Sequence, residues 1–196
     1  MNWLAHLYLS EPTAEFRIGN LLPDIIRIGD LAEVPAPFLP GVICHRKIDT
    51  YTDSHPVVAQ SKARIGAPFT KFSGVLVDVF YDHVLARNWA RFSSISLVPF
   101  AEEVYNSFDR FHDSLPPLAN ERLALMKKHQ WISAYDRLDG IALALQRMSR
   151  RLRRPLDLGD SVEILAEKYD EFSADFELFF PDLVAHVNLP HNLSPS

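Results

Sequence analysis

GVLVDVFYDHVLARNW, residues 74–89, is the stretch that decides the fold of this chain. It predicts a helix that is apolar on every side, and such a helix is buried inside a protein. It nevertheless contains Asp78 and Asp82, which lie one helical turn apart on the same side, and His83 beside them. Two carboxylates in an apolar interior need cationic partners, because removing unpaired charges from water is too costly. We therefore expect an arginine, a lysine or a metal ion to meet them.

The length and composition suit one cytoplasmic domain. The chain has 196 residues, of which 47% are hydrophobic and 23% charged, as in an ordinary soluble globular protein. The net charge of −5 gives no reason to expect nucleic-acid binding. The single cysteine, Cys44, excludes an intrachain disulfide and a cysteine metal cluster, and it fits a reducing compartment. We see neither a signal peptide nor an apolar run near the roughly 20 residues of a membrane span, so no membrane partner is expected.

The remaining chain predicts an all-α fold, a single-domain helical bundle. Apolar residues recur at helical spacing, and clean strand alternation is scarce. We expect one domain over residues 1–188 and a loose tail over residues 189–196, which contain two prolines and no periodicity. One further helix is predicted to begin at Pro23, and others are predicted over residues 41–53, 97–114 and 118–129. Two longer helices are predicted over 131–154, with a break near Gly140, and over 161–187, with a bend or stop at Pro181.

Several histidines and carboxylates in the first half of the chain lie on separate apolar elements. Each element buries one face, so packing them brings these polar residues together, as in helical bundles that build metal sites. The residues are His6, Asp24, His45, Asp49, Asp53, Asp78, Asp82 and His83. Imidazole and carboxylate ligands suit manganese, iron or zinc, and the lack of cysteine ligands favours manganese or iron. The alternative is a metal-free hydrogen-bonded network in which Asp82 pairs with Arg46 or Arg87.

Two groups of basic residues accompany this pattern. Arg46, Lys47 and Arg87 flank the acidic positions, where they either bind a phosphate or balance charge. Residues 147–154 contain five arginines and no acidic residue. Four of these arginines have spacings that allow them to share one helical face: Arg147, Arg150, Arg151 and Arg154. This arginine face is either a solvated helix end or a docking surface for an acidic protein.

Five motifs, taken together, resemble the acyl carrier protein phosphodiesterase family. They are NWLAHLYL at 2–9, GNLLPD at 19–24, CHRKIDTYTDSHP at 44–56, GVLVDVFYDHVLARNW at 74–89 and SRRLRRP at 149–155. The resemblance spans nearly the whole chain. It implies a helical fold similar to the HD-type phosphohydrolases and a divalent metal, usually manganese, with iron or magnesium as alternatives. It also implies hydrolysis of the phosphodiester that joins 4′-phosphopantetheine to a serine of acyl carrier protein.

The resemblance further implies roles for individual residues. The metal ligands would be His6, Asp24, Asp78, Asp82 and His83, and the catalytic residues would be His45, Asp49, Arg46 and Asn20. His45 or Asp49 would orient or deprotonate the attacking water, and Arg46 would steady the phosphate. The arginine face would bind the acidic carrier protein. Tyr8 departs from the family, which often has a histidine there, so position 8 is not expected to be an essential ligand.

Two other functions fit the same residues. An HD-type phosphohydrolase acting on a nucleotide or another small phosphate ester needs the metal site but no docking surface. A non-enzymatic helical scaffold that binds an acidic protein through its arginines needs no metal. The oligomeric state does not follow from the sequence.

Overall fold

The computed structural model describes residues 1–150, 152 and 156–188, and it contains helices but no β-strand in these ranges. The α-helices are α1 (Trp3–Tyr8), α2 (Ala14–Ile25), α3 (Leu39–Ser54), α4 (Pro56–Ala63), α5 (Ser73–Arg87), α6 (Leu97–Phe108), α7 (Pro117–Lys128), α8 (Leu138–Ser149), α9 (Val162–Glu167) and α10 (Tyr169–Asn188). Short 3-10 segments cover Ile28–Glu33, Ala36–Phe38, Thr70–Phe72, Trp89–Arg91, Asp109–Ser114, Ser133–Asp136 and Leu158–Ser161. The prediction of an all-α fold is confirmed.

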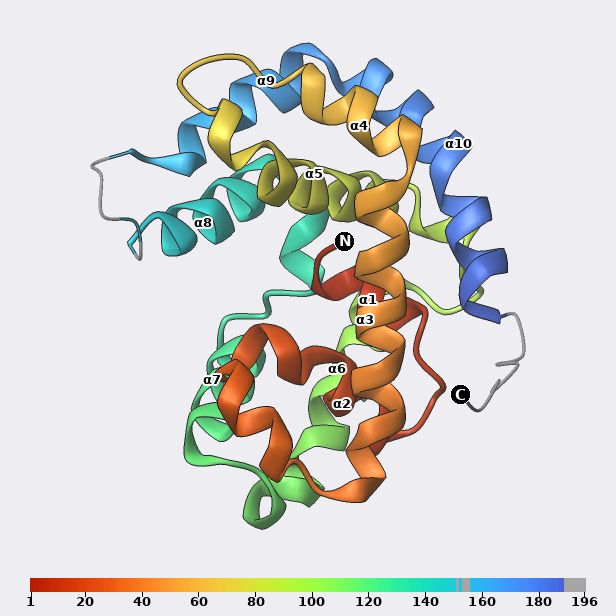
Figure 1. The fold of residues 1–196 in the computed structure, drawn as a ribbon, viewed down its shortest axis with the longest axis vertical. Helices are drawn as coiled ribbons and strands as arrows, with labels where there is room; N and C mark the ends of the chain where they lie inside the picture. The colour runs from red at the N-terminus through yellow and green to blue at the C-terminus, as the bar shows by residue number, and fades with distance from the viewer. Residues whose placement is uncertain (151, 153–155, 189–196) are drawn as a thin grey trace.

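Helix α5, predicted from its apolar sequence to be the buried helix, lies at the centre of the packing. It contacts α1, α4, α8 and α10. In Figure 1, α4, α9 and α10 lie above α5, α2, α6 and α7 form the lower part, and α3 runs along both parts. From Leu76 to Ala86 the helix is buried except at Asp78. Its first turn does reach the surface, because the side chain of Val75 is 43% exposed. This exposed start of α5 becomes important at the functional site.

The close packing of α2 on α3 depends on two glycines. A Cβ atom on Gly19 would lie 2.0 Å from the carbonyl oxygen of Phe38, and one on Gly41 would lie 2.2 Å from that of Phe16. Real Cβ atoms do not approach backbone oxygens so closely, so only glycine allows the two helices to meet here. This approach brings the backbone of Asn20, which follows Gly19, against the next part of α3.

Three predicted helix boundaries were wrong. Helix α2 begins at Ala14, where the Thr13 side chain accepts a hydrogen bond from Phe16 N, so Pro23 lies in its last turn rather than at its start. The helix predicted over 131–154 is interrupted at Arg137, whose backbone is extended, and Gly140 lies inside α8. The helix predicted over 161–187 is divided at Lys168 instead of Pro181. Proline removes one backbone hydrogen bond, but the packing of α10 tolerates that loss.

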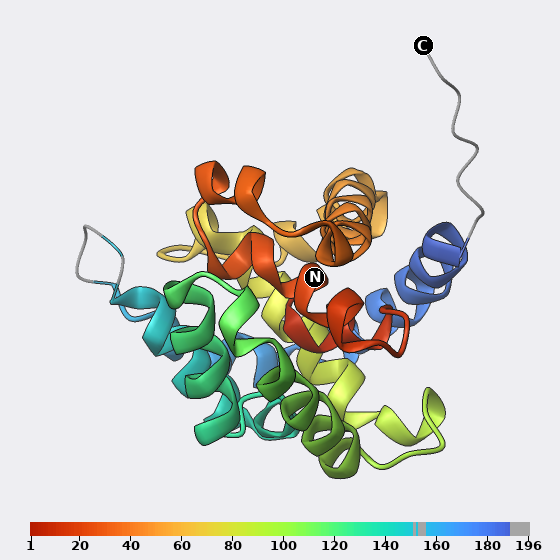
Figure 2. The ribbon, with the colours of Figure 1, turned by 90° about the horizontal axis from the view of Figure 1, so that it is seen from below.

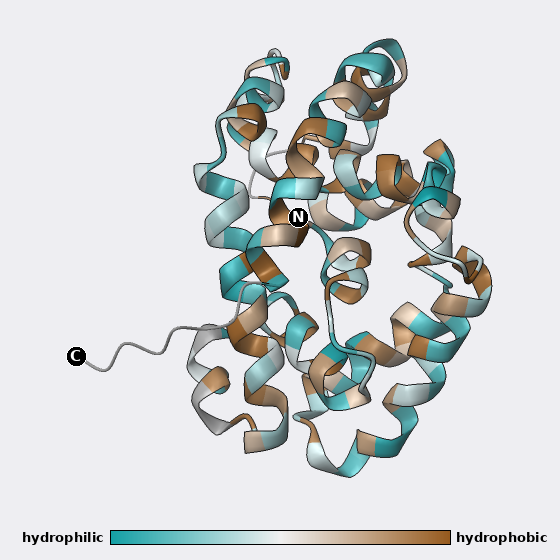
Figure 3. Cartoon of the chain, turned by 90° about the vertical axis from the view of Figure 1, so that its right-hand side faces the viewer, coloured by the Kyte–Doolittle hydropathy of each residue, from teal (hydrophilic) through white to brown (hydrophobic). Residues whose placement is uncertain are grey.

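The distribution of apolar and polar residues agrees with a core formed between helices. Figure 2 views the bundle from below, so that α3, which runs vertically in Figure 1, is seen nearly end on. In Figure 3, brown apolar residues gather where helices meet, and teal residues mark the outward faces. Within the described residues, every helix is too short or too polar to cross a bilayer. The predicted tail over 189–196 lies outside the described residues.

Candidate functional site

Two histidines and one carboxylate from two helices, α1 and α3, come together in the structure. His6 is on α1, and His45 and Asp49 lie one turn apart on α3; each offers a ligand atom within 4.8 Å of the others. His45 Nε2 lies 2.9 Å from Asp49 Oδ2, and His6 Nε2 lies 3.2 Å from Asp49 Oδ1. The two imidazole rings stack with their centroids 4.3 Å apart. We call these three residues the His–Asp cluster.

Asn20 on α2 orients both imidazoles of the His–Asp cluster. Its side-chain amide nitrogen donates to the His6 carbonyl oxygen at 2.8 Å and to Ser10 Oγ at 2.9 Å, which fixes the amide oxygen on the opposite side. That oxygen accepts a hydrogen bond from His6 Nδ1 at 2.9 Å. The backbone carbonyl of Asn20 accepts from His45 Nδ1 at 2.7 Å. Both Nδ1 atoms are thus donors, and in the neutral imidazoles both Nε2 atoms carry a lone pair.

The charges in the cluster stabilise one another. Burial by itself lowers the pKa of His45, but the hydrogen bond to Asp49 and the charge of Asp24 outweigh burial and raise this pKa above its ordinary value. Burial by itself raises the pKa of Asp49, but His45 and His6 outweigh it and hold the pKa of this carboxyl well below its usual range. Asp49 is therefore a carboxylate at neutral pH.

One atom of the cluster points to a bound cation. His6 Nε2 is buried and has no hydrogen-bond partner in the described part of the chain, although Asp49 lies close to it. A buried polar atom without a partner is costly and calls for an explanation. Two imidazole lone pairs and one carboxylate, with Nδ1 atoms fixed from behind, are the donor set and support that divalent transition ions use in proteins. The residues present therefore fit a divalent metal.

Among the residues expected to be metal ligands, Asp24 and Asp78 lie at the edge of the cluster. Asp24 Oδ1 is 3.8 Å from His45 Nε2, and Asp24 Oδ2 accepts a hydrogen bond from Trp3 Nε1 at 3.1 Å. Asp78 accepts from the α-amino group of Met1 at 2.9 Å, and the same amino group lies 3.8 Å from Asp49. Both carboxylates therefore border the cluster without being part of it.

Asp82 has a different partner from those expected. Its carboxylate accepts hydrogen bonds from the backbone N–H groups of Leu4 at 2.7 Å and Ala5 at 3.3 Å. These are donors in the first turn of α1, which have no partner within the helix. Burial raises the pKa of Asp82 to about 7. Neither acid of α5 is paired with an arginine or a lysine in the described residues: Asp78 is met by the terminal amino group and Asp82 by backbone amides, and a metal ion at either acid stays a prediction.

His83 and Tyr8 face away from the cluster. His83 Nδ1 donates to the Tyr135 carbonyl oxygen at 2.7 Å, and burial lowers the pKa of its ring. It does not join the group of ligand atoms around His6. Tyr8 Oη donates to the Phe92 carbonyl oxygen at 3.2 Å, and its ring packs on Trp89. Tyr8 therefore takes part in the packing of α1 against Trp89 and Phe92.

The predicted arginines lie in two separate parts of the molecule. Arg46 is exposed on α3, directly after His45. Arg147 lies over the ring of Trp131, with its guanidinium carbon 4.7 Å from the ring centroid. Of the arginines predicted to share one face, Arg147 lies in the last turn of α8 and Arg150 is the C-cap of this helix, and the shared face stays a prediction. Arg151 and Arg154 lie outside the described residues.

A pocket of about 690 Å³ opens beside the His–Asp cluster, and we call it the Trp131 pocket. It is lined from α1, α2, α5, α7 and α8 and from the segment between α7 and α8. Asp24 and Asp78 form the end of the pocket nearest the cluster, and four arginines line it: Arg122, Arg137, Arg147 and Arg150. Trp3 and Trp131 also line the pocket, and their rings stack with centroids 5.4 Å apart. They were not predicted as site residues, because helical periodicity does not connect positions so distant in sequence.

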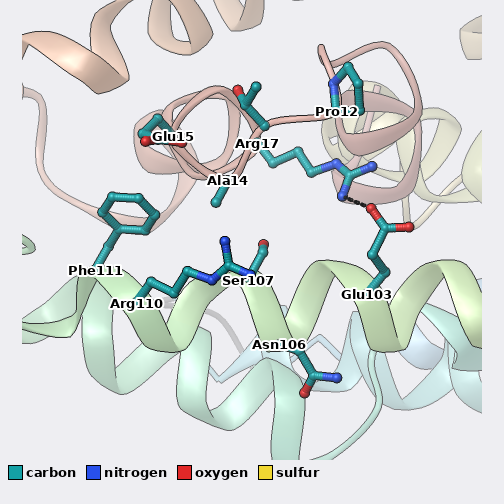
Figure 4. A pocket seen from close by; sticks show the side chains of 10 residues that line it. Pro12, Ala14, Glu15, Arg17, Glu103, Asn106, Ser107, Arg110 and Phe111 are labelled. Carbon is teal, nitrogen blue, oxygen red and sulfur yellow. Dashed lines mark hydrogen bonds and ion pairs between the residues drawn. The ribbon is translucent and has the colours of Figure 1, made fainter.

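A second pocket, of about 530 Å³, lies between the start of α2 and α6, and it is lined by neither Asp24 nor Asp78, the two acids that border the cluster. Figure 4 shows the Arg17 side chain extending to the carboxylate of Glu103, and their atoms lie 2.8 Å apart. This pair neutralises two of the charges that line the pocket. The position expected for chemistry is therefore the Trp131 pocket, whose lining residue Asp24 lies 3.8 Å from His45 of the His–Asp cluster.

Taken together, the fold and the cluster define a class: an all-helical protein whose imidazole and carboxylate groups suit a divalent ion, next to an arginine-lined pocket. The sequence matches the family model for acyl carrier protein phosphodiesterase over residues 1–183. The chain belongs to this family of enzymes, and the resemblance inferred from the five motifs is confirmed.

Curated relatives cover almost the full chain. A protein from Photorhabdus laumondii named acyl carrier protein phosphodiesterase is 29% identical over 92% of this chain and 92% of its own length. Proteins of the same name from Yersinia pestis and an Enterobacter strain are 28% and 29% identical, over 94% and 95% of this chain and 96% and 97% of their own lengths. No solved structure matches the chain significantly.

Proposed function

We propose that this protein is a metal-dependent phosphodiesterase that hydrolyses 4′-phosphopantetheine from holo acyl carrier protein and leaves the apo form. The names of the relatives support the carrier protein as the substrate. The observation that carries the proposal is the His–Asp cluster, in which the buried His6 Nε2 faces Asp49 and has no hydrogen-bond partner in the described residues, near an arginine-lined pocket. On this proposal the protein acts in the cytoplasm and is most similar in chemistry to the HD-type phosphohydrolases.

His6, His45 and Asp49 would hold the metal, with Asp24 beside them. We propose manganese, with iron or magnesium as alternatives, because imidazole and carboxylate ligands suit such ions. Lewis-acid polarisation of a phosphate oxygen is the chemistry that a divalent ion supplies in a site of this kind. Asn20 keeps both imidazoles in the tautomer that presents Nε2 to the site.

The acids and arginines around the cluster would then serve the phosphodiester. Asp24 and Asp78 face the pocket next to the cluster, where a carboxylate accepts a proton from an attacking water. Arg46, exposed directly after His45, carries a fixed positive charge for a phosphate oxygen. The acidic surface of a carrier protein would approach the side of the molecule that presents Arg147 and Arg150.

The test is direct. Purified protein is incubated with holo acyl carrier protein and manganese, and the carrier is then weighed by mass spectrometry. We expect conversion to the apo form, loss of this activity after chelation and recovery on adding the metal back. Turnover of nucleotides or small phosphate esters with intact holo carrier would instead indicate a general phosphohydrolase. A protein that binds the carrier without changing its mass and retains no metal would be a scaffold.

A further inference from the structure

The Trp131 pocket contains hydrogen-bond donors that the described part of the chain leaves without acceptors. Trp131 Nε1 and Arg122 Nε are buried atoms with no hydrogen-bond partner there. Leaving such donors unpaired costs free energy, so their presence in a pocket predicts a ligand with acceptor oxygens. Indole N–H and guanidinium groups only donate. The ligand therefore brings carbonyl or phosphate oxygens to this wall.

Apolar side chains separate these donors from one another. Val75 on α5 and Leu143 on α8 are large apolar residues that are 43% and 44% exposed. Both line the pocket, together with Ala144 and Met148. Binding sites for small organic groups have this composition, an apolar lining with a few placed polar groups, and volumes of about 300 to 1,000 Å³.

The pocket lies next to the His–Asp cluster, where the phosphodiester is proposed to react. Asp24 lines the pocket and is also 3.8 Å from His45 of the His–Asp cluster. Asp78 lines it and shares the Met1 amino group with Asp49. A molecule whose phosphate lies at the cluster can thus extend directly along the pocket toward Trp131. Arg147, held on the Trp131 ring, and Arg150 also line the pocket.

We infer that the Trp131 pocket binds the pantetheine arm of the substrate, a linear chain in which short apolar stretches alternate with amide groups. This inference rests on the proposed function. The amide carbonyl oxygens of the arm accept from Trp131 Nε1 and Arg122 Nε, and its methylene and methyl groups pack on Val75 and Leu143. The phosphate end of the arm lies at the His–Asp cluster, and the thiol end lies toward Arg150. The pocket then selects phosphodiesters that carry this arm over smaller ones.

The first experiment fills the pocket without touching the cluster. Ala144→Phe places a ring in the pocket, and Leu178→Phe places the same ring on α10, where Leu178 is 65% exposed and lies outside the pocket. We expect Ala144→Phe to lower kcat/KM for holo carrier protein about tenfold or more, because pocket contacts discriminate substrates by this factor. Hydrolysis of bis(4-nitrophenyl) phosphate, which has no arm, is expected to stay within about twofold of wild type. Leu178→Phe is expected to change neither rate.

The second experiment needs no catalysis. Free pantetheine is titrated into the wild-type protein while tryptophan fluorescence is followed, since Trp3 and Trp131 line the pocket. We expect a saturable signal that Leu178→Phe retains and that Trp131→Phe and Ala144→Phe lose. This measurement also serves if Ala144→Phe does not fold.

The outcomes separate the pocket from the proposed function. If wild-type protein converts holo carrier but folded Ala144→Phe does so equally well, or if pantetheine gives no saturable signal with wild type, the pocket assignment is overturned while the function stands. If wild-type protein leaves holo carrier intact, the proposed function fails. In that case the pantetheine titration still decides whether the pocket recognises this chemistry.

Discussion

Asp49 and Asp175 are both carboxylates held by nitrogen donors between helices, yet their surroundings differ in one respect. Asp175 on α10 is 3% exposed and is fully supplied with donors from α4. Its Oδ2 accepts from Ser61 Oγ at 2.7 Å and from Arg64 Nε at 3.0 Å, and its Oδ1 accepts from Arg64 Nη2 at 3.2 Å and Gln60 Nε2 at 3.3 Å. Tyr81 Oη completes this α4–α10 network by hydrogen bonding to Ser61 Oγ at 2.8 Å.

The His–Asp cluster around Asp49 is incomplete by the same measure. Asp49 is 40% exposed, and beside it His6 Nε2 is buried with no hydrogen-bond partner in the described residues. A buried charge alone therefore does not identify a functional site. A network with all donors and acceptors paired is sufficient to hold helices together, whereas a buried imidazole nitrogen without a hydrogen-bond partner is available for a ligand. The predictions below use this contrast.

The largest effect is expected from Asp49→Asn. The amide keeps the shape of the side chain but removes the charge that faces both imidazoles, so metal affinity and turnover should fall together. We expect kcat/KM to fall on the order of 10³-fold, as for other groups that act at the reacting centre. Metal content by mass spectrometry and conversion of holo carrier protein measure the two losses. Equal activity of Asp49→Asn and wild type would remove the cluster from the mechanism.

The matched substitution in the other network, Asp175→Asn, should have the reverse effect. It removes the charge that accepts from Arg64 and Ser61, while Arg64 keeps Glu171 as a partner, and hydrogen bonds to a charged group contribute about 1.5 to 3 kcal/mol to stability. Urea unfolding measures this loss, and metal content should remain that of wild type. An Asp175→Asn variant that loses metal while keeping its stability would contradict the distinction between the two networks.

A smaller effect on activity is expected from Asn20→Ala. The substitution removes the acceptor of His6 Nδ1 but keeps the backbone carbonyl that holds His45. Groups that orient ligands through a hydrogen bond change metal affinity or activity by about 10- to 100-fold. We expect weaker metal binding in a calorimetric titration, with part of the activity recovered at higher metal concentration. Full loss at saturating metal would instead make Asn20 a group that touches the substrate.

The sequence predicted the fold well where hydrophobic periodicity is strong. The all-α fold, α3, and the buried position of α5 follow from apolar residues at helical spacing and from Pro40 near the start of α3. Breaks at Arg137 and Lys168 were not predictable, because neither residue carries a local stop signal. They arise from how the segments on either side pack on the rest of the bundle.

The candidate site was predicted in composition but not in grouping. Spacing placed His45 and Asp49 on one face of α3, and the structure brings His6 to them. The two glycines that let α2 approach α3 have no periodic signature, and Asn20 on α2 then connects His6 on α1 with His45 on α3. The expected ligands Asp82 and His83 lie on α5, but backbone groups occupy them, and a backbone partner leaves no mark in a sequence. Whether either residue is a ligand remains a prediction, which the next variant tests.

The smallest effect is expected from Asp82→Asn, and it separates Asp82 from both networks. Asp82 is fully buried and accepts from Leu4 N and Ala5 N, so it holds the first turn of α1, the helix that carries His6. The amide offers one acceptor in place of two, so one backbone N–H loses its partner. Such a loss costs about 1 kcal/mol.

We therefore expect Asp82→Asn to lower the urea midpoint modestly while metal content stays at the level of wild type. Turnover at saturating metal should change little, because the ligand atoms of His6, His45 and Asp49 are untouched. Loss of bound metal in a variant that still unfolds cooperatively would place Asp82 among the ligands, as its family position implies. Retention of metal would assign Asp82, like Asp175, to the residues that hold helices in place, and Asp49 would then be the one of these three acids that binds the ion.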